Sequence, residues 1–96
     1  MAIAVQMDFD GATLEQYDEI CGKMGLTPKG PGPAGAISHF VTKTDTGFRV
    51  VDVWETQEQF QAFADEQIGP FSAEAGLTAP PQLAFFEVHN YFTPGS

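Results

Sequence analysis

Hydrophobic residues alternate with smaller or polar ones at the start of the chain, at Ile3, Val5, Met7 and Phe9. A repeat of two residues is typical of a strand with one buried face. The Asp10-Gly11 pair then interrupts the alternation. The pattern therefore predicts a first β-strand that ends before this pair.

Helical spacing replaces the alternation after Thr13. Thr13 and Gln16 have the spacing of a capping box, in which the hydroxyl and the amide bind free backbone N–H groups at a helix start. Gly25 stands where a left-handed terminating residue is expected. A helix to about Met24 follows, with one apolar stripe. The stripe comprises Leu14, Tyr17, Ile20, Cys21 and Met24.

A Pro- and Gly-rich segment, residues 28–35, separates this helix from a hairpin. Proline lacks the N–H group and glycine loses most entropy on ordering, so the segment is predicted to be a loop, either a lid over a pocket or a passive connector. Strands over residues 36–42 and 48–55 flank a turn at 44–47 and form the hairpin.

The second half of the chain repeats the order of the first half. Thr56 and Gln59 again have capping-box spacing and predict a second helix that stops at Gly69-Pro70. A short helical turn over residues 70–75 is compatible with the pattern. A last strand is predicted over residues 82–92, with both faces apolar. The apolar stripe of the second helix comprises Phe60, Phe63, Ala64 and Ile68.

This order of elements predicts the fold class α+β, a ferredoxin-like βαββαβ domain. Right-handed crossovers place both helices on one face of a four-stranded antiparallel sheet and leave the other face bare. Because the third strand is apolar on both sides, we expect a second copy to cover that face, so that a homodimer closes an eight-stranded β-barrel. One domain spans residues 1–96, with residues 93–96 expected to be a disordered tail.

Composition narrows the classes of function. A hydrophobic content of 43% with 9 Phe is enough for a packed core, and a net charge of −9 disfavours both nucleic acid and anionic membranes as partners. No apolar run is long enough to span a bilayer, and the start of the chain lacks the features of a secretion signal. Since the single cysteine, Cys21, can form no internal disulfide and reads as a small buried hydrophobe, we expect a cytoplasmic protein.

The third-strand segment from Phe48 to Thr56, with the run Asp52-Val53-Trp54-Glu55-Thr56, resembles the signature of dimeric α/β-barrel proteins related to antibiotic-biosynthesis monooxygenases. The resemblance implies the same fold, and a pocket for a flat hydrophobic molecule. Two features depart from it. Members that oxidise polycyclic phenols without a cofactor commonly carry an Asn where this chain has Val50, and haem-degrading members carry a helix histidine where this chain has Phe60 and Phe63.

Polar residues on the hairpin are the first candidates for chemistry. If Lys43 pairs with Phe48, His39 lies opposite Asp52 on the same face, and the two could act as base and orienter in abstracting a proton from a phenol or from a carbon next to a carbonyl. If Thr44 pairs with Phe48 instead, the register slips by one residue and the two side chains point to opposite faces. The sequence leaves both registers open.

The last strand supplies a second group of candidates. If the strand is regular, His89 shares a face with Glu87 and Tyr91, and these residues are predicted to contact a substrate. Trp54 is predicted to line the same pocket and, with Tyr91, to stack on a flat ligand, although strand aromatics are more often core residues. The spacing of His39 and His89 does not suggest a metal site, and no cofactor is expected.

Two functions follow from these candidates. The first is a small-molecule enzyme that performs proton transfer or cofactor-independent monooxygenase-like chemistry inside the barrel, with His39 and Asp52 as catalytic residues. The second is a non-catalytic homodimer that binds a small hydrophobic or aromatic ligand or serves as a scaffold. A solid core of aromatic rings would favour the second, and an open cavity bounded by histidine the first.

Overall fold

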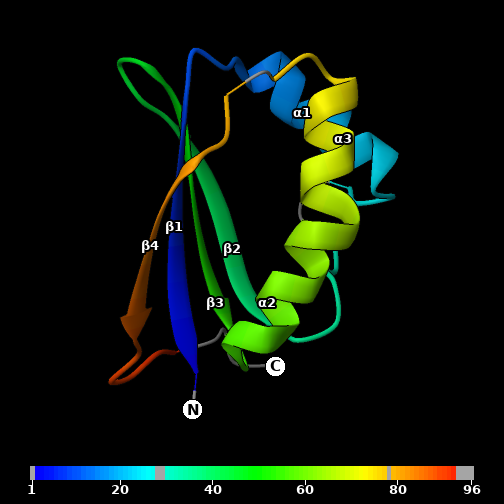
Figure 1. The fold of residues 1–96 in the computed structure, drawn as a ribbon. Helices are drawn as coiled ribbons and strands as arrows, with labels where there is room; N and C mark the ends of the chain where they lie inside the picture. The colour runs from blue at the N-terminus through cyan, green and yellow to red at the C-terminus, as the bar shows by residue number, and fades with distance from the viewer. Residues whose placement is uncertain (1, 28–29, 78, 93–96) are drawn as a thin grey trace.

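The computed structural model describes residues 2–27, 30–77 and 79–92 and has the predicted βαββαβ order, with the second helix divided into three parts. The four strands form one antiparallel sheet in the order β2-β3-β1-β4. All helices lie on one face of it (Figure 1), as predicted. The elements are β1 (Ile3–Asp10), α1 (Leu14–Lys23), β2 (Ala36–Lys43), β3 (Gly47–Trp54), α2 (Gln57–Phe63), η1 (Ala64–Ile68), α3 (Gly69–Glu74) and β4 (Gln82–Glu87).

The hydrophobic core lies between the sheet and the helices. Every second residue of the two central strands, β1 and β3, is buried, which is the alternation that a half-covered sheet requires. Phe9 and Phe48 stack at one end of this layer with ring centroids 4.7 Å apart. The buried hydrophobic residues are Val5, Met7, Phe9, Ala12, Ile20, Phe48, Val50, Trp54 and Phe60.

Helix α1 begins with the predicted capping box. The backbone N–H of Gln16 donates to Oγ1 of Thr13 at 3.2 Å, and Oε1 of Gln16 accepts from the N–H of Thr13 at 2.9 Å. After the helix, Gly25 has a φ of 77°, the left-handed conformation that glycine adopts at little cost. These two features define where α1 begins and ends.

The second helix does not end at Gly69-Pro70, which corrects the sequence prediction. It continues to Glu74 because one turn of π-helix, η1, precedes the proline, with the N–H of Gly69 donating to the carbonyl of Ala64 five residues earlier. In a regular α-helix the proline ring collides with the carbonyl four residues before it. The wider π turn relieves that collision, so Pro70 begins α3 instead of ending the helix.

The last strand is shorter than predicted. β4 ends at Glu87, because its partner β1 begins at Ile3, which pairs with Glu87. One further hydrogen bond, from the N–H of Val88 to the carbonyl of Ala2, closes the ladder at 3.2 Å. Residues 88–92 follow outside the sheet, and the tail predicted over residues 93–96 lies outside the described residues.

The side of the sheet that faces away from the helices is partly apolar, and we call it the open face. Phe40 and Phe86 are 56% and 55% exposed there, and Val51 and Val53 lie between them on β3. In the described ranges 2–27, 30–77 and 79–92, no helix has the length and apolar character needed to cross a membrane.

Candidate active site

The hairpin adopts the register that brings His39 and Asp52 together. Lys43 pairs with Phe48, so His39 of β2 lies directly opposite Asp52 of β3. Nδ1 of His39 is 2.5 Å from Oδ1 of Asp52. Because an ionised carboxylate only accepts hydrogen bonds, Nδ1 carries the proton and donates it, which leaves Nε2 of a neutral imidazole as an acceptor.

Asp52 is a buried carboxylate whose two oxygens both have donors. Its side chain is 6% exposed, against 42% for that of His39. The indole N–H of Trp54 donates to Oδ2 at 3.1 Å, while Oδ1 accepts from His39. Buried carboxylates are tolerated when they are paired in this way. Asp52 is therefore held in one orientation between an aromatic ring and an imidazole.

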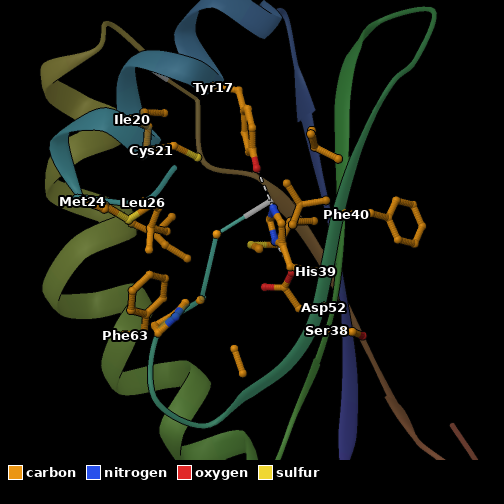
Figure 2. Close-up of a pocket in the computed structure, with 18 of the residues that line it drawn as sticks. Tyr17, Ile20, Cys21, Met24, Leu26, Ser38, His39, Phe40, Asp52 and Phe63 are labelled. Atoms are coloured by element: carbon orange, nitrogen blue, oxygen red, sulfur yellow. Dashed lines mark hydrogen bonds and ion pairs between the residues drawn. The ribbon is translucent and has the colours of Figure 1, made fainter. Parts of the chain in front are cut away.

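Tyr17 of α1 is the third residue of the site. The sequence predicts it only as a member of the apolar stripe of that helix. Its hydroxyl is 2.6 Å from Nε2 of His39, and the two rings are nearly parallel, at 9°. Tyr17 also packs edge-on against Phe48, with ring centroids 5.5 Å apart. Figure 2 shows Tyr17, His39 and Asp52 in line, with Tyr17 approaching from the helix and the other two from the sheet.

The three side chains border a cavity of about 780 Å³ between the sheet and the helices. This volume is within the range of small-molecule sites, and the lining is mostly apolar. Residues 30–33 of the Pro/Gly-rich loop also line it, so this segment does lie against a pocket. Other lining residues include Met7, Phe9, Ile20, Cys21, Met24, Phe48, Val50, Trp54, Phe63, Ile68 and Ser72.

The position of the cavity corrects one expectation. The sequence predicts a pocket inside a barrel made by two sheets, but Asp52 and Trp54 share the helix-facing side of β3 with the core residues Phe48 and Val50. The cavity therefore lies within one chain. Phe40, the neighbour of His39, points away from it toward the open face (Figure 2).

Burial shifts the pKa values of two further polar groups at the cavity, Tyr17 and Cys21. Burial raises the pKa of Tyr17 well above its usual range, and contact with Cys21 and the negative charges of Asp52 and Asp18 act in the same direction. Burial also raises the pKa of the Cys21 thiol, although contact with Tyr17 opposes this effect. At neutral pH Tyr17 is thus a neutral phenol, and burial favours the protonated form of the Cys21 thiol.

The residues predicted on the last strand are not brought to this site. Glu87 ends β4, His89 lies in a bend and Tyr91 lies beyond it, and none of the three lines the cavity. Their predicted shared face required a regular strand to Phe92, which the short partner strand β1 does not support. Within the described part of the chain, no group of three His, Cys, Asp or Glu residues could hold a metal ion.

Comparison with known proteins finds similarity in structure alone. No family model matches the chain, and no curated protein matches it. A protein of unknown function from Nitrosomonas europaea has a TM-score of 0.66 at 20% identity, covering 99% of this chain and 94% of that one.

Two Streptomyces oxygenases have the same architecture. A monooxygenase from Streptomyces coelicolor, solved with the ligand nanaomycin D, has a TM-score of 0.53 at 18% identity, covering 98% of this chain and 92% of its own. A cofactor-independent oxygenase from Streptomyces nogalater has a TM-score of 0.55 at 14% identity, covering 97% and 96%. The chain therefore has the fold of antibiotic biosynthesis monooxygenase-like proteins, as the third-strand resemblance predicts.

Proposed function

We propose that this protein is a small-molecule enzyme that removes a proton from a flat, hydrophobic, weakly acidic substrate in the cavity, with His39 as the base. The observation that carries the proposal is the hydrogen-bonded pair of His39 and Asp52 on the wall of an apolar cavity of about 780 Å³. A carboxylate on Nδ1 fixes the tautomer of the imidazole and stabilises the imidazolium that forms when Nε2 takes a proton.

The charges around the cavity favour an uncharged substrate. Among the described lining residues, the ionisable groups other than His39 are Asp18, Asp52, Tyr17 and Cys21, and none of these carries a positive charge. The chain as a whole has a net charge of −9. A carboxylate or phosphate ester would be repelled, whereas a neutral phenol or ketone would enter and become an anion only beside the newly charged His39.

A second candidate, favoured by the two Streptomyces relatives, is that proton removal begins a cofactor-independent oxygenation. In that reaction a substrate CH₂ group loses a proton to His39, and the resulting carbanion is oxidised by O₂. One oxygen atom replaces the two hydrogens as a carbonyl, and the other leaves as water. The first step is the same in both candidates, so one test serves for both.

The test uses 2-tetralone, an uncharged bicyclic ketone with acidic hydrogens next to its carbonyl. Exchange of these hydrogens in D₂O, followed by NMR, measures proton removal directly. We expect His39→Ala and Asp52→Asn each to slow the catalysed exchange by about 10²- to 10⁴-fold, the usual contribution of an acid or base. His89→Ala, the same change at the other histidine, should have no effect.

Unchanged exchange in folded His39→Ala protein would reject the enzyme proposal. Binding of naphthols without any exchange, detected through the fluorescence of Trp54, the single tryptophan, would instead favour the non-catalytic ligand-binding alternative. Trp54 is suited to this measurement because it lines the cavity and is 1% exposed.

We further propose that two copies of the chain pair through the open face. Phe40 and Phe86 are more than half exposed there, with the valines of β3 between them, and exposed apolar patches are typical of interfaces. A dimer would cover this patch without closing the cavity, since the cavity lies on the other side of the sheet. We also propose a cytoplasmic location, which suits the free thiol of Cys21.

A further inference from the structure

The base of the proposed reaction is already engaged in the structure. The Tyr17 hydroxyl lies 2.6 Å from Nε2 of His39. When the imidazole is neutral with its proton on Nδ1, Nε2 is its one acceptor nitrogen, and the hydroxyl donates to it. A substrate therefore cannot give its proton to Nε2 while this contact is present. Either Tyr17 leaves, or the proton passes through it.

The structure holds Tyr17 in place. Its ring lies edge-on against buried Phe48 and nearly parallel to the ring of His39, and both contacts would be lost if the side chain swung out. Helix α1, which carries it, is fixed by the capping box at Thr13 and is joined to α3 by an ion pair between Lys23 and Glu74 at 3.7 Å. Tyr17 itself lines the cavity, so its oxygen is within reach of a bound substrate.

From this geometry, and resting on the function proposed above, we propose that Tyr17 is a catalytic residue that relays the substrate's proton to His39. In the relay step, the O–H bond of Tyr17 breaks and its proton bonds to Nε2. At the same time the Tyr17 oxygen takes the proton of the substrate. The substrate becomes an anion, Tyr17 is regenerated as a phenol, and His39 becomes an imidazolium paired with Asp52.

The ionisation of the site agrees with this role. The groups that face Tyr17 are Cys21 and Asp18 on its own helix, His39 on β2 and Asp52 on β3, and the pKa of Tyr17 is raised mainly by burial. The phenol therefore keeps its proton at neutral pH and approaches His39 as a donor. A tyrosinate would instead make a poor partner for a neutral imidazole acceptor.

The relay predicts that Tyr17→Phe slows the exchange of 2-tetralone by about 10²- to 10⁴-fold, because the substitution removes only the oxygen and keeps the ring contacts. Tyr91→Phe, the same change at the only other tyrosine, should leave the rate unchanged. An unchanged or faster rate in Tyr17→Phe would show that the hydroxyl merely covers Nε2, and would overturn the relay. If His39→Ala also had no effect, the proposed function itself would fail.

A second measurement, the solvent isotope effect, separates a relay from a structural role. Loss of a tritium label from 2-tetralone is followed in H₂O and in D₂O at matched pH. In a relay the exchangeable proton of Tyr17 moves in the rate-limiting step, so release should be slower in D₂O for the unmodified protein. The residual activity of Tyr17→Phe should not share this solvent effect. Equal rates in the two solvents for the unmodified protein would contradict the relay.

Discussion

Trp54 and Asp52, two residues apart on β3, are joined by a hydrogen bond of 3.1 Å from the indole N–H to Oδ2. Since residues i and i+2 of a strand share a face, the same alternation that buries Trp54 also directs Asp52 into the helix-facing layer. The indole thus supplies the donor that a buried carboxylate needs, while the other oxygen remains for His39. Loss of this bond should therefore destabilise the fold.

Replacing Trp54 with Phe should lower the free energy of unfolding, because Oδ2 of Asp52 loses its partner in a buried position. A double-mutant cycle with Asp52→Ala, which removes both acceptor oxygens, separates this bond from the loss of packing. We expect a coupling energy of about 1.5 to 3 kcal/mol, the range for hydrogen bonds to charged groups. Urea unfolding followed by circular dichroism measures it, and strictly additive effects would contradict the assigned bond.

Ser72 should tolerate the loss of its hydroxyl. Its Oγ is buried and has no hydrogen-bond partner among the described residues, and it lies in α3, where alanine is the better helix former. We expect Ser72→Ala to leave the free energy of unfolding unchanged or to raise it by up to about 1 kcal/mol, since an unsatisfied buried group is removed.

Thr56→Ala is the matched control for Ser72→Ala. The hydroxyl of Thr56 accepts from the N–H of Gln59 and caps α2, so its removal should cost about 0.5 to 2 kcal/mol. Chemical denaturation of both variants makes the comparison. A loss at Ser72 as large as that at Thr56 would mean that the Ser72 hydroxyl has a partner in solution.

The open face should control self-association. Phe86→Asp places a charge in the apolar patch of both copies of the proposed dimer, and burial of one Phe is worth about 1.5 to 3 kcal/mol. The dissociation constant should rise by about 100-fold or more, measured by analytical ultracentrifugation. Leu14→Asp, at a partly exposed position of the helical layer, is the control and should change little. A wild-type protein that stays monomeric at all concentrations would reject the dimer.

Asp8 and Arg49 form an ion pair on the open face, with Nε of Arg49 2.7 Å from Oδ1 of Asp8. The hydrogen bond from Arg49 lowers the pKa of Asp8 below 3.8, the ordinary value of an aspartate side chain. A lowered folded-state pKa means that the charged form contributes stability above pH 3.8, and that this contribution disappears as the pH falls through the folded-state pKa.

Asp8→Asn should therefore reduce stability at pH 7 and not in acid. Urea unfolding of both proteins at pH 7 and near pH 2.5 compares the two conditions, and Asp45→Asn, in the exposed hairpin turn, is the control. Because the pair is partly exposed, added salt should reduce the difference at pH 7. The same loss at both pH values would indicate that the substitution acts through packing.

Much of the fold could be predicted because its signals are local. The capping residues at Thr13 and Thr56 and the alternation in β1 and β3 each depend on a few neighbouring residues. The end of β4 depends instead on where β1 begins, and the continuation past Pro70 depends on a π turn that proline chemistry alone does not indicate. Both errors arise because the structure at these points depends on residues outside the local pattern: the partner strand in one case and the preceding helical turn in the other.

The candidate site was predictable only in part, for the same reason. His39 and Asp52 were identified as a pair, but the four-residue turn at 44–47 is compatible with two registers, and only the folded sheet selects one. Tyr17 belongs to an apolar helix stripe, and this pattern predicts a core residue and not a site residue. Its contact with His39 joins residues 22 positions apart, from α1 and β2, and no pattern within either segment reveals that distance.

Strand β3 directs Asp52 and Trp54 to the cavity and the alternate residues, Val51 and Val53, to the open face. The proposed active site and the proposed dimer contact therefore both depend on the same alternation of side chains along β3. Insertion or deletion of one residue within Gly47–Trp54, unless a β-bulge absorbed it, would exchange the two sides of the residues that follow, so the proposed chemistry and the proposed dimer would be lost together. Under both proposals, divergence within this strand should proceed by substitution rather than by change of length.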